Sequence, residues 1–400
     1  MRYMNWWSKA LIPAALLVLH NAQRIAPVPL FDELRLRFAT DYVGVGNLFG
    51  AYLLTYAVSN IPAGILADRV DNKHLLTIGA ALSLLASLVF AIAKDFPMAL
   101  ASRLALGISG ALIYIPSVRY VVISFPKEKR ASAMGVVEVG AGVGMFLSLT
   151  LLPLLAREFD LLRAFLMLPV FAALVLGAVL LGLSREEPQG RASFRARLIT
   201  LGGSRSLWYL LIYFFLGMLA HYSVLGWLPT FLRTNFSYSA VQAGLISTLV
   251  TLSLIVGSPL AGILSDRLGT RTWILLCGSG MSVISFLLFL AGQDPKVVIG
   301  AALLAGISMA FTIPVLMILV GEMSEPAGAG LAVSVAATTG QISSSFSGFV
   351  FGYALQTSQS FAVVWGLALI LAAGGIPFLF GTMKQIRLRS ASRAHPMKKS

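Results

Sequence analysis

The sequence GILADRVDNK at residues 64–73 recurs as GILSDRLGTR at residues 262–271, and this repeat is the strongest indication of the fold. Both copies follow a long apolar run and end in a basic residue. The glycine that opens each copy is small enough to let two helices approach closely, and the Asp that follows is suited to cap a helix end. The two ten-residue stretches are identical at five positions and stand at equivalent turns, which indicates two repeated halves. The residues predicted to act in these turns are Gly64, Asp68, Arg69, Gly262, Asp266 and Arg267.

The composition excludes an ordinary water-soluble domain. Of the 400 residues, 58% are hydrophobic and 12% are charged, and the mean hydropathy is +0.85, whereas soluble chains carry about 25% charged residues. The net charge of +14 does not indicate nucleic acid, because the basic residues are spread through short loops and are not massed on one face. The one cysteine, Cys277, excludes a disulfide scaffold and a Cys-based metal cluster. The composition predicts a polytopic membrane protein.

Twelve apolar runs are long enough to cross a bilayer, whose hydrocarbon core takes about 20 helical residues. They lie near residues 9–30, 42–66, 74–93, 97–124, 131–156, 163–183, 206–232, 240–264, 272–292, 297–320, 328–355 and 360–382. The predicted fold class is an all-α membrane protein with twelve transmembrane helices in two pseudo-symmetric six-helix bundles. The predicted divisions are an N-terminal bundle (1–183), a linker loop (184–205), a C-terminal bundle (206–383) and a basic tail (384–400).

The distribution of Lys and Arg predicts the orientation, because basic loops resist translocation across the membrane. The loops on the side of the two termini hold twenty of these residues, and the opposite loops hold seven. Both termini are therefore predicted to be cytoplasmic, in a multi-pass protein of the cell (inner) membrane. The first run is not a cleavable signal peptide, since Asn21, Gln23 and Arg24 interrupt it. The basic tail either binds anionic lipid or, more simply, anchors the topology.

The repeated turns resemble the G-x-L-A-D-R-x-G-x-[KR] loop motif of the major facilitator superfamily, although Asp71 stands where that family usually has Gly. Arg103-x-x-x-Gly107-x-x-Gly110 resembles the motif of the same family's fourth helix. The resemblance covers nearly the whole chain and implies a monomeric secondary transporter whose two halves rock about a central substrate site. It implies a structural or coupling role for Arg103. No Walker-type sequence occurs, which fits a carrier that is not driven by ATP.

A narrower resemblance concerns the first span. The segment His20-Asn21-Ala22-Gln23-Arg24, followed by Pro27 and Pro29, resembles the Asn-Tyr-x-Asp-Arg segment of the organic anion:cation symporters within that superfamily. Arg24 matches that segment, whereas Gln23 replaces an Asp that is thought to carry protons in those relatives. The resemblance therefore implies anion binding at Arg24 more strongly than it implies proton coupling through the usual residue.

Arg24 is the first of four charges inside the spans, where each charge costs about 2.5–3.5 kcal/mol even on insertion scales. It lies about 15 residues from Lys9, which is roughly 22 Å into a core about 30 Å thick. Its guanidinium offers a planar fork for a carboxylate or phosphate, and His20 and Asn21 share its helical face. The alternative is an Arg that snorkels to the outer headgroups or pairs structurally. We predict that Arg24, His20 and Asn21 bind the substrate.

Arg119 and Glu138 lie about eight residues on either side of the basic loop at 127–130, on consecutive antiparallel spans. Their equal depth predicts a salt bridge, which makes both charges tolerable in lipid. The alternative makes Glu138, the sole acid inside the spans, the proton-coupling residue and Arg119 a second positive charge for the substrate. The fifth span also carries a small-residue patch, residues 140–144, that predicts close packing between the halves.

Polar groups without a permanent charge lie on two spans of the second half. His221 lies near the middle of the seventh span, where an imidazole could relay protons or donate to an anion. A histidine whose hydrogen bonds are satisfied within the protein is the simpler interpretation, for His221 and for His20. Span eleven carries a polar stripe that either joins helices or binds substrate hydroxyls: Ser334, Thr338, Gln341 and Ser345.

These features predict a secondary active transporter of a small organic anion, a carboxylate, that works by rocker-switch alternating access with protons as the candidate coupling ion. Its partners would be that anion and membrane lipid, with no nucleic acid, metal or cofactor. The alternative is a proton-driven efflux carrier for amphipathic drugs or metabolites, in a cavity lined by aromatic residues of span seven. No nucleophile–base pair or cofactor loop predicts an enzyme. The sequence leaves open the substrate's identity and the direction of transport.

Overall fold

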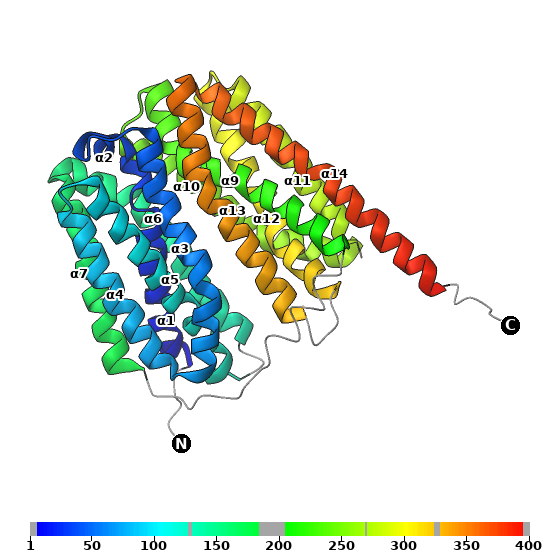
Figure 1. Cartoon of the computed structure of the whole chain (residues 1–400), viewed down its shortest axis with the longest axis horizontal. Helices are drawn as coiled ribbons and strands as arrows, with labels where there is room; N and C mark the ends of the chain where they lie inside the picture. Colours follow the sequence, from blue (N-terminus) through cyan, green and yellow to red (C-terminus); the bar gives the residue numbers. More distant parts are fainter. Residues whose placement is uncertain (1–5, 127–129, 184–204, 269, 324–328, 395–400) are drawn as a thin grey trace. The chain divides into compact units, whose positions relative to one another are not determined.

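The computed structural model describes residues 6–126, 130–183, 205–268, 270–323 and 329–394, and regular structure in these residues is helical (Figure 1). Before the linker the helices are α1 (Trp6–Ile25), the 3-10 turn η1 (Val28–Leu30), α2 (Phe31–Arg37), α3 (Tyr42–Arg69), α4 (Asn72–Ile92), α5 (Phe96–Ser124), α6 (Arg130–Glu158) and α7 (Leu161–Gly182). After it they are α9 (Arg205–Phe236), α10 (Ala240–Leu268), α11 (Arg271–Ala291), α12 (Pro295–Glu322), α13 (Ala329–Ser358) and α14 (Phe361–Ala394).

Eleven of the described helices are long and apolar enough to cross a membrane. The twelfth long helix, α13, has 30 residues, but its Ser, Thr and Gln residues lower its hydropathy. The all-α fold class with twelve long helices near the predicted positions is therefore confirmed in the part of the chain that the structure describes. Most of the predicted linker lies outside the described residues, and its last residue, Arg205, begins α9.

Aspartate caps set where many of the spans begin. In each case the side-chain carboxylate accepts a hydrogen bond of 2.6–3.2 Å from a main-chain N–H in the first turn. Such a carboxylate satisfies a donor that has no partner within the helix, and it favours the positive end of the helix dipole. The caps are Asp41 of α3, Asp71 of α4, Asp95 of α5, Asp160 of α7 and Asp294 of α12.

The first apolar run differs from the single span predicted over residues 9–30. Helix α1 ends at Ile25, because Pro27 and Pro29 have no N–H to continue the helical hydrogen bonds. The chain then turns through η1 into α2, a helix of seven residues. This break places the predicted substrate residue Arg24 in the last turn of α1.

The described helices form two compact units. The first contains α1 to α7 together with residues 225–236 of α9, 240–251 of α10 and 344–358 of α13. In this unit α1 packs along α6, and its Leu16 and Leu19 join a core with side chains of α4, α5 and α7. The second unit contains α11, α12, most of α14 and the remaining parts of α9, α10 and α13. The predicted division into sequence halves stays a prediction.

The glycine patch of α6 packs differently from the prediction. A Cβ built on Gly140 would overlap the carbonyl oxygen of Ala14, and one on Gly144 would overlap that of Val18. Both contacts are with α1, so the patch closes a helix pair within the first half and not a contact between halves. The spacing in the sequence showed that a close approach exists, but it did not identify the partner helix.

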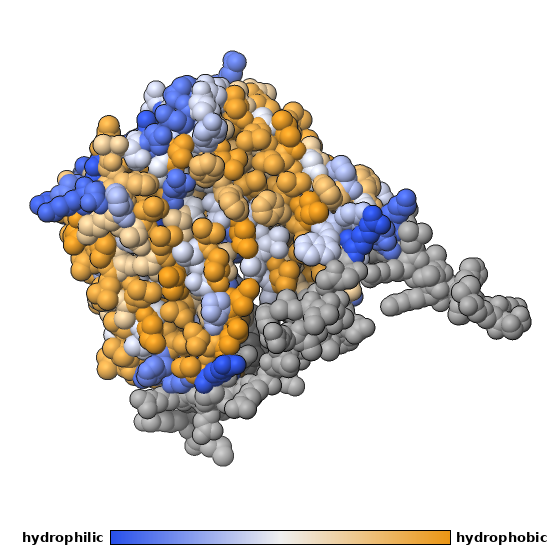
Figure 2. Space-filling model, viewed as in Figure 1, coloured by the Kyte–Doolittle hydropathy of each residue, from blue (hydrophilic) through white to orange (hydrophobic). Residues whose placement is uncertain are grey.

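Apolar side chains cover much of the visible face, and hydrophilic side chains gather mainly near helix ends (Figure 2). The exposed large residues include Leu174, Val256 and Ile370, whose relative exposures are 65–68%. Trp208 and Trp273, near the starts of α9 and α11, are each 54% exposed, as is typical of tryptophans at a membrane interface. This surface suits contact with lipid.

Candidate substrate and coupling site

A buried arginine of α5 holds the broken end of α1. Arg103 donates from Nη1 to the Gln23 carbonyl at 2.5 Å and from Nη2 to the Arg24 carbonyl at 2.9 Å. In a continuous helix the Gln23 carbonyl would accept from residue 27, but that residue is proline and has no N–H. The guanidinium therefore replaces the missing donor, and its Nε donates to the Leu48 carbonyl of α3 at 2.8 Å. This geometry agrees with the structural role implied for Arg103.

A charged cluster, defined as Arg24, Tyr114 and Glu138, brings together α1, α5 and α6. The Tyr114 hydroxyl donates to Glu138 Oε1 at 3.4 Å, and the Arg24 charge interacts electrostatically with both residues. Arg24 is half-buried and Glu138 is exposed. The cation and the acid can thus balance each other, and neither is fully buried.

The partner predicted for Glu138 was Arg119, and the structure gives a different neighbour. The carboxylate faces the Tyr114 hydroxyl and the Arg24 charge. Arg119 lies five residues beyond Tyr114 on α5, which is about 140° around the helix, and it has contacts of its own. Equal depth in the membrane did not determine which faces of the two helices meet.

His20 is buried in the first unit, and its Nδ1 is hydrogen-bonded. Its Nδ1 lies 2.7 Å from the Tyr52 hydroxyl, and its ring lies 5.0 Å from that of Tyr56 and 6.3 Å from that of Tyr114. Gly110 leaves the room for this ring, because a Cβ there would lie 2.7 Å from His20 Nδ1. The simpler interpretation of His20, a satisfied polar side chain, fits this arrangement.

The two amide side chains beside Arg24 are also held by the protein. Asn21 donates from Nδ2 to the Leu17 carbonyl at 3.1 Å, and Gln23 accepts from the Ser83 hydroxyl at 2.7 Å. Both side chains are buried. Gln23, which stands where the related symporters carry an Asp, therefore ties α1 to α4 and does not join the charged cluster.

In the second unit His221 is buried and both of its ring nitrogens have partners. Nδ1 lies 2.7 Å from the Gly217 carbonyl, and Nε2 lies 2.7 Å from the Ser308 hydroxyl of α12. Because the carbonyl can only accept, Nδ1 donates to it, and the Ser308 hydroxyl also donates to the Ala305 carbonyl at 2.8 Å. His221 thus joins α9 to α12 through its side chain.

The two copies of the repeated turn make different contacts. Lys73 donates to the Leu180 carbonyl at the end of α7 at 2.8 Å, whereas Arg271 lies 2.6 Å from Asp266 and 3.1 Å from Glu322. A Cβ built on Gly64 or Gly262 meets nothing within 4 Å, so the close helix approach predicted at these glycines is wrong. Arg69 and Arg267 are exposed, and the Asp68 side chain lies outside the described part.

The sequence did not single out Tyr52 or Tyr114, nor the acidic pair Asp32 and Glu33. The four-residue spacing of Tyr52 and Tyr56 was the available signal for an aromatic face on α3. Asp32 and Glu33 lie between the first two predicted spans, in a loop on the side opposite the termini. Charged residues are common in such loops, so these two gave no sign of a function. No group of three metal-binding side chains was found among the described residues.

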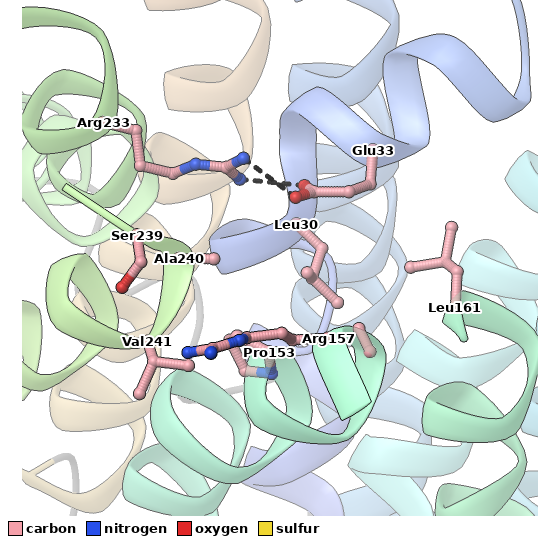
Figure 3. A pocket seen from close by; sticks show the side chains of 10 residues that line it. Leu30, Glu33, Pro153, Arg157, Leu161, Arg233, Ser239, Ala240 and Val241 are labelled. Atoms are coloured by element: carbon pink, nitrogen blue, oxygen red, sulfur yellow. Dashed lines mark hydrogen bonds and ion pairs between the residues drawn. The ribbon is translucent and has the colours of Figure 1, made fainter. Parts of the chain in front are cut away.

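A pocket of about 300 Å³ lies elsewhere in the first unit (Figure 3). It is lined by Leu30, Glu33, Pro153, Ala156, Arg157, Leu161, Arg233, Ser239, Ala240 and Val241. Glu33 and Arg233 face each other across its rim, joined by hydrogen bonds. None of the predicted substrate residues lines this pocket.

The sequence model of the Major Facilitator Superfamily matches residues 13–244 and 230–398. The chain belongs to this superfamily. It is therefore a multi-pass membrane protein and a secondary transporter, and it is not an enzyme. The predicted resemblance to the superfamily is confirmed, whereas the organic anion symporter subtype stays a prediction.

Two relatives and one solved structure illustrate the likeness. A probable sugar efflux transporter of Mannheimia succiniciproducens is 23% identical over 279 residues, 67% of this chain and 70% of that protein. A chloroplastic probable anion transporter of Oryza sativa subsp. japonica is 25% identical over 299 residues, 68% of this chain and 57% of that protein. The nucleoside transporter NupG has a similar structure, with a TM-score of 0.77, 14% identity and coverage of 96% of this chain and 99% of NupG. This last likeness concerns the fold alone.

Proposed function

We propose that this transporter carries a small organic anion, a carboxylate, and that Arg24 binds it. The observation that supports this is the charged cluster, in which a half-buried guanidinium stands in the last turn of α1. Its main chain is held by the buried Arg103, so the cation has a fixed place from which to present its planar fork to a carboxylate. Arg119 is the second positive charge in this proposal.

Glu138 is the proposed proton-coupling residue. The negative charge of ionised Glu138 partly offsets the positive charge of Arg24. An ionised Glu138 therefore weakens the attraction of Arg24 for an anion. When Glu138 takes a proton, the guanidinium regains its full attraction for the substrate carboxylate. Proton and anion would therefore bind together, which is symport. The Tyr114 hydroxyl, 3.4 Å from Glu138 Oε1, keeps that carboxyl turned toward the cluster.

The transporter is proposed to lie in the cell membrane as a monomer with both termini in the cytoplasm. Twenty Lys and Arg residues in the loops on that side, against seven on the other, support this orientation. The interfacial tryptophans Trp208 and Trp273 stand at the helix starts that this orientation places on the cytoplasmic side. His20 and Asn21, which lie on the same helix as Arg24, support the site without carrying its charge.

The second candidate function is efflux of a neutral amphipathic or sugar-like metabolite. It is favoured by the relative named as a probable sugar efflux transporter and by the aromatic rings around His20, which are those of Tyr52, Tyr56 and Tyr114. Rings with hydroxyl groups suit a hydroxylated solute. In that case Arg24 and Glu138 would balance each other throughout the cycle, and no anion would bind.

Uptake into proteoliposomes distinguishes the two. A panel of labelled carboxylates and sugars is offered with and without an imposed pH gradient, to the wild type, Arg24→Ala and the control Arg163→Ala. Arg163 is exposed and pairs only locally with Asp160 at 3.4 Å. We expect one or more carboxylates to accumulate with wild type and control but not with Arg24→Ala. Transport of a neutral sugar that is unchanged in Arg24→Ala would overturn the anion proposal.

A further inference from the structure

The end of α9 belongs by its contacts to the first unit, although it comes from the second half of the chain. Residues 205–224 of α9 belong to the second unit, whereas residues 225–236 belong to the first. Side chains of residues 225–236 contact η1, α2 and α3. In a rocking mechanism the two halves of the chain move against each other. The contacts of residues 225–236 must then be made and broken in each cycle, and they decide how firmly this end of the protein is closed.

Trp227 is the apolar part of this contact. Its side chain is fully buried, and its ring lies 5.2 Å from that of Phe31 and 6.1 Å from that of Tyr42. Gly46 and Gly352 leave room for it, because a Cβ on either would lie 3.1–3.2 Å from the indole carbon Cζ2. The indole Nε1 has no hydrogen-bond partner within the described part of the chain. A buried tryptophan usually finds such a partner, so this closed position leaves a donor unsatisfied.

Arg233 is the charged part. Its Nη1 and Nη2 donate to the two carboxylate oxygens of Glu33, each at 2.8 Å (Figure 3). Nη1 also donates to the Pro29 carbonyl at 3.2 Å and lies 3.4 Å from Asp32. A fork-to-fork pair of this kind fixes geometry as well as charge. All three partners belong to the short segment that follows the break in α1.

Two further close approaches hold the same end together. A Cβ on Gly46 of α3 would overlap the carbonyl oxygen of Gly348 of α13, and a Cβ on Gly348 would overlap that of Gly46. A Cβ on Gly244 of α10 would overlap the carbonyl oxygen of Leu149 of α6. A pocket of about 300 Å³ lies beside Arg233 and Glu33. It leaves space into which the guanidinium can move when it separates from its partners, and water in the pocket can solvate the charge there.

We propose that Trp227 and Arg233 form a latch that holds the end of α9 on the segment of residues 28–33 and releases it when this end of the transporter opens. Arg233 fixes the closed register through Glu33 and Asp32, and Trp227 fills the glycine-lined hole. The unsatisfied indole donor and the adjacent pocket limit the stability of the closed state, so the contact can open during the transport cycle. The latch depends on alternating access alone and not on the nature of the substrate.

Cysteine labelling tests the latch in purified protein in detergent, where the reagent reaches both ends. Thr230, which is buried on α9 between the two latch residues, is changed to Cys in a Cys277→Ser background. We expect Arg233→Glu to raise the rate of maleimide labelling at this position by about tenfold or more, since it replaces a part-buried, bidentate charge pair with like charges. The matched control Arg163→Glu breaks an exposed pair and should leave the rate within about twofold.

The charge swap Glu33→Arg with Arg233→Glu should return the labelling rate to within about threefold of the wild-type background. Trp227→Ala should raise the rate, and Trp227→Phe should raise it less. If Arg233→Glu fails to fold, Arg233→Gln removes the charge without repulsion and should give a smaller rise. A labelling rate in the Arg233 variants equal to that of the control, or no recovery in a folded swap variant, would overturn the latch.

Discussion

The two halves of the chain place their ionisable groups differently. All four charges inside the spans, Arg24, Arg103, Arg119 and Glu138, belong to the first half, and the charged cluster is built from three of its helices. The described spans of the second half hold His221, whose ring nitrogens bind the protein itself, and hydroxyl groups such as Ser308. The charged cluster gives the first half a cation that can attract an anion, whereas His221 in the second half is held by contacts with the protein itself.

The difference begins with the break in one helix. Helix α1 ends at its prolines and needs Arg103 to satisfy its last carbonyls. Helix α9 contains Pro229 but continues to Phe236. Eight residues after its aspartate cap, α5 carries Arg103, whereas α12 carries Ala302 at the same distance from Asp294. A buried cation thus occurs where an interrupted helix requires donors, and alanine suffices where the helix is continuous.

The largest expected effect comes from Arg103→Met, which leaves carbonyls of Gln23, Arg24 and Leu48 without their donor. We expect it to lower the free energy of unfolding by about 3–5 kcal/mol, measured by denaturant titration in detergent. Arg163→Met, at an exposed position, should change it by less than about 1 kcal/mol. Equal stability of the two variants would mean that the break in α1 does not need this cation.

The second prediction compares how much a residue of each half contributes to transport. Arg24→Gln should lower kcat/KM for carboxylate uptake by about 100-fold, or about 2.7 kcal/mol, because it removes a charge-assisted contact. His221→Gln, which keeps a polar group beside Ser308, should lower it by less than about tenfold. If the His221 variant loses as much as the Arg24 variant, substrate recognition is shared between the halves.

Glu138→Gln should remove the pH dependence of uptake while leaving the exchange of substrate across the membrane intact. The amide is neutral at every pH and so imitates the protonated acid. Initial uptake rates between pH 5 and 8 are compared with those of wild type, where we expect a change of about tenfold. A Glu138→Gln transporter with the wild-type pH profile would show that another group couples the protons.

The smallest expected effect concerns the repeated turns. Arg271→Ala removes contacts with Asp266 and Glu322, and Lys73→Ala removes one hydrogen bond to the Leu180 carbonyl. Each pair lies near the surface, so each change should cost less than about 1 kcal/mol of stability. We expect Arg271→Ala to be the more destabilising of the two in the same denaturant titration. The reverse order would contradict the contacts seen here.

The sequence predicted the twelve helices well, because the length of an apolar run is a local property. It also predicted that Arg24, Arg103 and Glu138 lie inside the membrane, where a charge is costly and implies a structural or functional role. It could not predict that Glu138 faces Arg24 and not Arg119, since depth follows from residue counting but helix rotation depends on tertiary packing. The contact between Glu33 and Arg233 joins residues 200 positions apart, for which the sequence carries no local signal.

Calorimetry of the purified protein tests whether Arg24 binds the substrate carboxylate while Glu138 takes up a proton. Titrating a transported carboxylate in two buffers of different ionisation enthalpy reports the affinity and the protons taken up. We predict binding by wild type with proton uptake, binding by Glu138→Gln without it, and an affinity about 100-fold lower in Arg24→Gln. Wild-type affinity in a folded Arg24→Gln protein would contradict the claim.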